Sequence, residues 1–166
     1  MIKNICLSLA ASAALFSGAA QAASEYLIKI NGINGTSTLV GFTDYIEVES
    51  WSVGFTKGIC QDLHFVKEMD AASADLTGAV LVKITYPTVT LIARRAGRET
   101  PFTYMKLTLA NSVFTSFQVG GSAGGSLIPF EQISLSSASG LFELFGEQAD
   151  GTVVKVAENS FTCKVK

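Results

Sequence analysis

Apolar and polar residues alternate along one long stretch of the chain, residues 102–121, which reads FTYMKLTLANSVFTSFQVGG. From Met105 onward the odd positions are mostly apolar, whereas the even positions are mostly small and polar. A period of two residues is typical of a β-strand with one face packed inward. At roughly 3.3 Å per residue, this strand is longer than the strands of most small sheets. We therefore expect it to bend at Asn111-Ser112, with its odd positions facing inward throughout, and to serve two parts of a strongly curved sheet.

Shorter alternating stretches surround this central strand, and turn residues separate them. Asn31-Gly32, Asn34-Gly35 and Asp150-Gly151 favour tight turns, and the last predicts a hairpin. Strands are predicted at residues 26–30 and 46–55, around Leu63 and Phe65, around Val89, Leu91 and Ala93, around Ile133 and Leu135, and around Phe161, Cys163 and Val165. The pattern predicts a mostly β protein, a small curved β-barrel. Its core is expected to include Trp51, Phe65, Leu107 and Leu109.

One segment departs from the alternation and has the spacing of a helix. Ser73 can cap its N-terminus, and Asp75 lies in the first turn, where a negative charge is favourable. The residues that follow at helical intervals are Leu76, Ala79, Val80 and Lys83. We predict one short α-helix at about residues 73–83, which flanks or plugs the barrel and buries Trp51 against the sheet. The alternative is a buried strand at residues 79–84.

Residues 36–43, TSTLVGFT, show neither period and are predicted to form an extended loop. Leu39, Val40 and Phe42 are apolar, and no local pattern requires them to be buried. Exposed together, they would form an apolar patch of the kind that marks an interaction site. We therefore expect an oligomer interface here. The alternative is a loop that folds back over the edge of its own sheet.

Residues 1–22 have the pattern of a signal peptide. Lys3 precedes an apolar run at residues 5–16, and Ala20-Gln21-Ala22 is a small-x-small cleavage site. We predict cleavage before Ala23, which leaves a single domain at residues 23–166 that is exported to the periplasm or the extracellular space. The alternative is a short membrane anchor that is retained. No later stretch is long and apolar enough to span a bilayer, so no membrane contact is expected after cleavage.

Charge and cysteine content indicate which partners and which compartment suit the chain. The chain has 12 basic and 14 acidic residues, and Lys3 is the single charge in the signal, so the mature chain has 11 basic against 14 acidic residues, a net charge of −3. This mild acidity gives no electrostatic basis for binding nucleic acid. Cys60 and Cys163 remain after cleavage and can form a disulfide in an exported protein. The alternative is two separate buried thiols.

Residues suited to catalysis or metal binding are few. The single histidine, His64, lies within a predicted strand and is interpreted as a surface or packing residue. The glycine-rich run at residues 120–125 lacks the Lys-Ser/Thr of a phosphate loop and predicts a flexible hairpin loop. The carboxylates of Asp44, Glu47 and Glu49 could act as a catalytic pair, but strand alternation favours a solvated or inter-subunit face. No metal-ligand spacing and no set of nucleophile, base and orienting group occurs. We expect neither enzyme activity nor a cofactor.

Several short segments form an informative ordered set. They are residues 46–54 (IEVESWSVG), 62–67 (DLHFVK), 73–76 (SADL), 93–95 (ARR), 107–111 (LTLAN) with Gly120-Gly121, and 131–135 (EQISL). The first is similar to the Ser-Trp-Ser-aromatic-Gly strand of the Hcp family, and the second to the Asp-x-x-Phe-x-Lys of that family. Because the set covers residues 26–135 in the family's order, the chain resembles Hcp, the tube protein of type VI secretion systems.

The resemblance implies a small β-barrel with one flanking helix that assembles into a hexameric ring. Rings of that family stack into a tube, carry effectors in the lumen and are themselves exported by the contractile apparatus. The expected partners are therefore further copies of the chain, and secreted effectors or other secretion components. Small polar positions such as Thr108, Ser112 and Ser116 would suit a hydrated lumen wall.

Three features depart from the family pattern. The family has no cleavable signal, Thr36 and Val53 replace a glutamate and an aromatic residue, and the cysteine pair suits an oxidising compartment. The departures support the family fold more than the family function, and the alternative function is a periplasmic or extracellular binding module on the same fold. Such a module would use the 36–43 loop to contact its partner.

Overall fold

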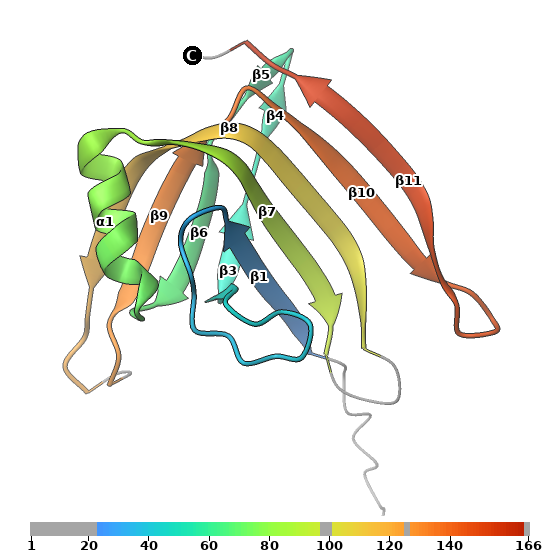
Figure 1. The fold of residues 1–166 in the computed structure, drawn as a ribbon, viewed down its shortest axis with the longest axis horizontal. Helices are drawn as coiled ribbons and strands as arrows, with labels where there is room; N and C mark the ends of the chain where they lie inside the picture. The colour runs from blue at the N-terminus through green and yellow to red at the C-terminus, as the bar shows by residue number, and fades with distance from the viewer. Residues whose placement is uncertain (1–22, 97–100, 125–126, 165–166) are drawn as a thin grey trace, which may run out of the picture.

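The computed structural model describes residues 23–96, 101–124 and 127–164 (Figure 1). The predicted signal at residues 1–22, part of the predicted glycine-rich loop and Val165 lie outside these ranges. The described elements in chain order are β1 (Ser24–Ile30), β2 (Ile46–Val48), β3 (Ser50–Ser52), β4 (Phe55–Thr56), β5 (Ile59–Cys60), β6 (Leu63–Glu68), α1 (Ala72–Val82), β7 (Thr85–Arg95), β8 (Phe102–Gly120), β9 (Phe130–Ser136), β10 (Ser139–Glu147) and β11 (Val153–Thr162). The chain is mostly β with one short helix, as predicted.

β8 is the central strand of the main sheet, as the long alternating stretch predicted. The strand order is β2-β1-β7-β8-β9-β6-β3, and neighbouring strands are antiparallel. One edge of β8 pairs with β7, whereas the other edge pairs first with β10 and then with β9. β11 pairs with β10 and extends this part of the sheet to the side (Figure 1). Because β7, β9 and β10 all pair with β8, this strand joins the two parts of a curved sheet.

The predicted bend in β8 occurs at Asn111, which has a left-handed backbone conformation with a φ of 52°. Up to this residue the buried side chains are Met105, Leu107 and Leu109, at odd positions. Beyond it the buried side chains are Ser112 and Phe114, at even positions. The prediction that odd positions face inward along the whole strand is therefore wrong after Asn111. One residue in the left-handed region interrupts the pleat and reverses the faces.

The sheet is strongly curved but is not closed into a barrel, which corrects the predicted β-barrel. The predicted strand at residues 46–55 is divided into β2, β3 and β4. β2 pairs with β1 at one end of the strand order, and β3 pairs with β6 at the other end. In the chain, only Glu49 lies between β2 and β3. The Glu49 amide donates a hydrogen bond to the Val66 carbonyl at 2.8 Å. Closure would require the same residues to pair on both sides, and here the two pairings do not overlap.

The predicted helix is present as α1, and the alternative of a strand at residues 79–84 is wrong. α1 begins one residue before the predicted start, so Ser73 is not its N-cap. Instead, Asp70 Oδ1 accepts a hydrogen bond from the Ala72 amide at 3.0 Å, and Ser73 Oγ accepts one from the Asp70 amide at 3.0 Å. Ala72, Leu76 and Ala79 are buried at helical spacing, which places α1 against β8.

Three of the four predicted core residues are fully buried: Phe65, Leu107 and Leu109. Trp51 is only half-buried, so the expectation that it lies fully buried between sheet and helix is wrong. Its ring packs edge-on against Tyr26 of β1 at a centroid distance of 6.1 Å. β3 is the last strand of the sheet order and pairs only with β6 among the described strands, which leaves one side of Trp51 open to solvent.

The predicted hairpin at Asp150-Gly151 joins β10 and β11. Gly151 has a φ of 83°, a value that glycine adopts without strain. Asp150 Oδ1 accepts hydrogen bonds from the Thr152 amide at 2.9 Å and from its hydroxyl at 2.6 Å. These bonds lower the pKa of the Asp150 carboxyl, because they favour its ionised form. The turn chemistry read from the sequence is confirmed.

Candidate functional site

One face of β3, β6, β9 and the C-terminal half of β8 carries uncharged polar side chains. The strand register places Ser52, His64, Ser134 and Ser116 in one row across the four strands. His64 Nδ1 lies 2.7 Å from Ser134 Oγ, and Ser116 Oγ lies 2.8 Å from the same oxygen. A neighbouring row contributes Ser50, Gln132 and Gln118. The two rows line a groove of about 500 Å³, which we call the polar groove.

The polar groove offers many hydrogen-bonding groups and little charge. His64 is exposed and bonds to a serine hydroxyl, which confirms that it is a surface residue. The residues that line the groove include no carboxylate. A Ser-His pair needs such a group, or an equivalent one, to orient the imidazole for nucleophilic attack. The hydroxyl, amide and imidazole groups of the groove can form hydrogen bonds with water or with a contacting surface.

The three small polar residues expected on a lumen wall lie in three different environments. Ser116 lines the polar groove. Thr108 lies on the other half of β8, where it pairs with Thr90 and Leu141. Ser112 is fully buried opposite Tyr86, because the face reverses at Asn111, so its expected place on the wall is wrong. Burial, and to a smaller extent the charge of Asp75, raises the pKa of Tyr86.

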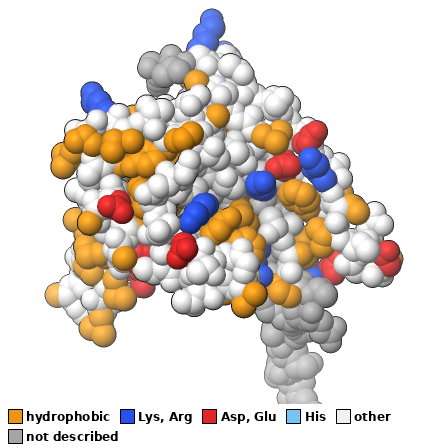
Figure 2. Space-filling model, viewed as in Figure 1, with side chains coloured by type: hydrophobic (Ala, Val, Ile, Leu, Met, Phe, Trp, Pro, Cys, Tyr) orange, Lys and Arg blue, Asp and Glu red, His pale blue; other side chains and the backbone are white. Residues whose placement is uncertain are grey.

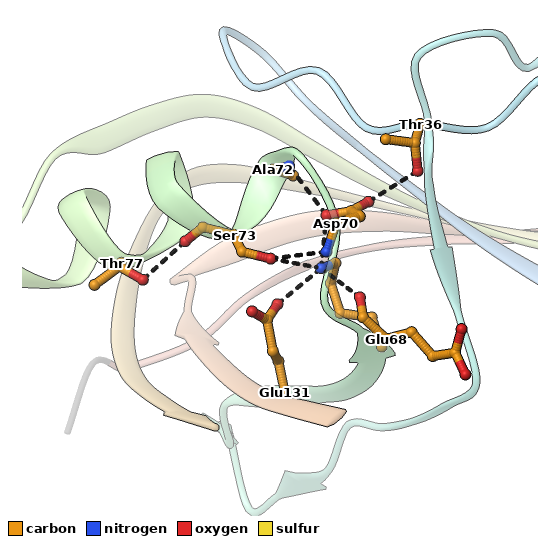
Figure 3. Close-up of polar contacts among 8 residues, drawn as sticks. Thr36, Glu68, Asp70, Ala72, Ser73, Thr77 and Glu131 are labelled. Atoms are coloured by element: carbon orange, nitrogen blue, oxygen red, sulfur yellow. Dashed lines mark hydrogen bonds and ion pairs between the residues drawn. The ribbon is translucent and has the colours of Figure 1, made fainter. Parts of the chain in front are cut away.

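A buried ion pair lies beside the start of α1 (Figure 3). Lys67 Nζ is 2.7 Å from Glu131 Oε2, and these two side chains are 1% and 0% exposed. The same ammonium group lies 2.7 Å from Asp70 Oδ1. It also donates hydrogen bonds to the Glu68 carbonyl at 2.7 Å and to Ser73 Oγ at 3.3 Å. The lysine charge is thus compensated by two carboxylates and fully bonded inside the fold.

This cluster ties together four parts of the chain. Lys67 lies on β6 and Glu131 lies directly opposite on β9. Asp70 Oδ1 also accepts the hydrogen bond from the Ala72 amide at the start of α1, and Asp70 Oδ2 accepts a hydrogen bond from Thr36 Oγ1 at 3.1 Å. Thr36 begins the 36–43 loop, so the hydroxyl that departs from the family pattern connects this loop to the cluster. The cluster therefore has a structural role, since it fixes the loop, α1 and two strands relative to one another.

The 36–43 loop is more closely packed than its sequence predicted. Val40 is 96% exposed, but Leu39 and Phe42 are half-buried. The Phe42 ring packs edge-on against Tyr45 at 5.3 Å, and the guanidinium of Arg94 lies 4.8 Å from its centroid. The expected patch of three exposed apolar residues is therefore wrong for two of them, because the loop folds partly over its own sheet. Val40 alone projects into solvent at the tip of the loop.

Cys60 and Cys163 form a disulfide, with their Cα atoms 5.4 Å apart. The bond joins β5 to the residue that follows β11. Within the described ranges, no three His, Cys, Asp or Glu side chains gather in a way that could hold a metal ion. No helix among those residues is long and apolar enough to cross a bilayer. On the face seen in Figure 2, basic and acidic side chains are interspersed and neither sign forms an extended area.

The described residues combine a curved antiparallel sheet, one flanking helix and a polar groove. A family model described as "Type VI secretion system effector, Hcp" matches residues 27–139. The chain therefore belongs to the Hcp family of the type VI secretion system. Hcp is a family of structural tube proteins rather than of enzymes, which agrees with the function expected from the sequence.

Individual proteins that are similar to this chain also carry the name Hcp. The chain is 29% identical over 141 residues to "Protein hcp1" of Pseudomonas aeruginosa, covering 76% of this chain and 86% of that protein. The crystal structure of Hcp1 from Salmonella typhimurium superposes with a TM-score of 0.73 at 26% identity, covering 85% of this chain and 96% of that one. A second solved structure, described as a type six secretion system protein, has a TM-score of 0.75 at 24% identity over 84% of this chain and 96% of its own. This second likeness shows the shared fold.

Sequence reasoning did not find the Lys67 cluster, although a signal for it was present. Leu63, Phe65 and Lys67 alternate on one face of β6, and the first two are buried. Glu131 alternates in the same way with Ile133 and Leu135 on β9. A charge that continues the apolar face of a strand must be buried with a partner, because an isolated buried charge is very costly.

Proposed function

We propose that the mature chain is the subunit of a homo-oligomeric ring that stacks into a tube of the Hcp type. In this role it is a structural and exported component, and the tube can carry effectors. The observation that carries the proposal is the family match over residues 27–139. The polar groove supports it, because neutral hydroxyl and amide groups suit a hydrated wall along which unrelated proteins pass.

Light scattering on the purified mature chain tests this function. We expect a particle close to the mass of a hexamer, since the family to which the chain belongs assembles as rings. Measurement at several concentrations, by size-exclusion chromatography with multi-angle scattering, separates a closed ring from a growing polymer. A closed ring keeps one mass over a wide range of concentration. A chain that stays monomeric at tens of micromolar would contradict the proposal.

A second function is favoured by the disulfide between Cys60 and Cys163. Disulfides persist in oxidising compartments, whereas a cytoplasmic tube subunit is kept under reducing conditions. The alternative is a periplasmic or extracellular Hcp-like module that binds a partner outside any secretion tube. It predicts a monomer in the same measurement. Residues 36–43 would then contact a different protein.

We propose that residues 1–22 direct export of the chain from the cytoplasm. Lys3, the apolar run at residues 5–16 and Ala20-Gln21-Ala22 support the proposal. Intact-mass spectrometry of protein recovered from the periplasm or the medium should give Ala23 or a close neighbour as the first residue. Replacement of Ala22 by a bulky residue should block processing. Protein that keeps Met1 and accumulates in the cytoplasm would count against export.

A further inference from the structure

A second groove lies between two hairpins that are far apart in the sequence. β4 and β5 form a two-stranded sheet of their own, and in Figure 1 they lie beside the end of β11 at the top of the view. The β4–β5 hairpin and the β10–β11 hairpin enclose a groove of about 530 Å³, which we call the hairpin groove. Pockets of this size hold small organic ligands.

The walls of the hairpin groove are apolar and come from both hairpins. The apolar side chains that line it are Phe55, Ile59, Phe142 and Phe161. Phe55 packs edge-on against Phe161 at a centroid distance of 4.9 Å and is 50% exposed. A Cβ atom at Gly140 would lie 2.7 Å from Phe161 Cζ, so this glycine leaves the space that the ring occupies. An apolar ligand in the groove would therefore contact aromatic rings on both walls.

The disulfide fixes the two walls of the hairpin groove relative to each other. Cys60 lies on β5, whereas Cys163 follows β11 and lines the groove. Beside this bond, the Lys164 amide donates a hydrogen bond to the Gly58 carbonyl at 3.0 Å. The walls are thus in place before a ligand binds, and a preformed site binds its ligand with a smaller loss of conformational entropy.

Lys57 supplies the charge at the rim of the hairpin groove. Among the described residues that line the groove, Lys57 is the one charged side chain, and none is acidic. Lys57 is exposed and belongs to no ion pair among the residues that the structure describes. An ammonium group at an apolar opening favours a ligand with an anionic head, because charge complementarity selects the partner and the orientation of binding.

The backbone of Lys57 gives a second, independent indication. Lys57 and Gly58 form the two-residue turn between β4 and β5, with φ values of 47° and 77°. Positive φ at both positions fits a type I′ turn, which favours Asn, Asp or Gly at the first position. Lysine adopts the left-handed region less readily than these residues do. A side chain kept in an unfavourable conformation beside a groove is typical of a functional constraint, here the ammonium group at the rim.

We propose that the hairpin groove binds a single-chain amphipathic carboxylate, that is, a free fatty acid. The alkyl chain lies against the rings of Phe55, Phe142 and Phe161. The carboxylate lies at the rim and pairs with the Lys57 ammonium group. The volume of the groove suits one alkyl chain rather than the two chains of a membrane phospholipid. This binding function is separate from ring formation and does not depend on it.

Isothermal titration calorimetry of the oxidised mature chain with monomeric laurate tests the site. We expect one laurate per chain, and weaker binding of dodecylamine, which has the same alkyl chain and a cationic head. Lys57→Glu should weaken laurate binding by roughly tenfold and strengthen dodecylamine binding, because the charge at the rim is reversed. The matched control is Lys83→Glu, which should leave both affinities unchanged. Lys83 is also exposed and left-handed, with a φ of 51°, but it lies at the end of α1 and does not line the groove.

Two further variants separate binding from folding. Lys57→Asn places a favoured residue in the turn, so it should raise the melting temperature while it weakens laurate binding. Phe55→Ser removes a half-exposed ring and should weaken the binding of laurate and dodecylamine alike. Equal laurate affinity of the wild type and Lys57→Glu, or no binding by the wild type, overturns the proposal. Binding to phosphatidylglycerol vesicles with none to monomeric laurate also overturns it, because it indicates a membrane surface instead of a groove for one chain.

Discussion

Replacement of Lys67 by methionine should lower the free energy of unfolding by about 3–5 kcal/mol, the loss typical when one partner of a buried ion pair is removed. The side chains of Lys67 and Glu131 are 1% and 0% exposed, so water cannot replace the missing ammonium group. Glu131 Oε1 already has no hydrogen-bond partner among the described residues. Without Lys67, the whole carboxylate would be left uncompensated. Urea unfolding followed by circular dichroism measures the change.

A matched control and a second-site variant make this result specific. Lys106→Met removes an ion pair with Glu143 whose lysine is 42% exposed, so it should change stability by less than about 1 kcal/mol. Lys67→Met combined with Glu131→Leu removes both charges and should recover most of the loss, because apolar pairs replace buried ion pairs well. If Lys67→Met unfolds at the same urea concentration as the wild type, the cluster does not hold β6, β9 and α1 together.

Cys163→Ser should lower the free energy of unfolding by about 4–5 kcal/mol, the value that loop-closure entropy gives for a loop of about 100 residues. The two cysteines are separated by 103 positions, so the cross-link removes a large share of the freedom of the unfolded chain. Thermal melting with and without a reductant measures the effect. The reductant should destabilise the wild type and leave the melting of Cys163→Ser unchanged. An equal melting temperature for reduced and oxidised wild type would contradict the prediction.

The extent of β8 and its bend could be read from the sequence, but the reversal of its faces could not. Alternation and length identify a long strand, and Asn111 is a residue type that tolerates the left-handed region. After Asn111 both faces of β8 mix apolar and polar residues, for example Val113 and Thr115 against Ser112 and Phe114. The pattern therefore does not decide which face is buried. The register with β9 and the packing of the core decide it.

The candidate surfaces, too, could be predicted only in part from the sequence. The 36–43 loop was recognised from its lack of a period, yet its burial depends on Arg94, which lies far away in the sequence and packs on Phe42. Lys67 could be placed on a buried face by alternation. Its partner Glu131 follows only from the register between β6 and β9, because the two positions are 64 residues apart in the chain. Contacts that link distant segments are the part of a site that local patterns do not contain.

The place of β8 in the sheet also sets the order in which the strands can pair during synthesis. β1, β2 and β7 can pair among themselves as soon as they emerge, but β9 and β10 both require β8 as their neighbour. β3 and β6 can pair with each other early, but they join the main sheet only through β9, which lies more than 60 residues further along the chain. Such non-local pairing makes folding slow. If residues 1–22 direct export as proposed, the chain would still be unfolded for most of its passage, which is the state that a narrow translocation channel accepts.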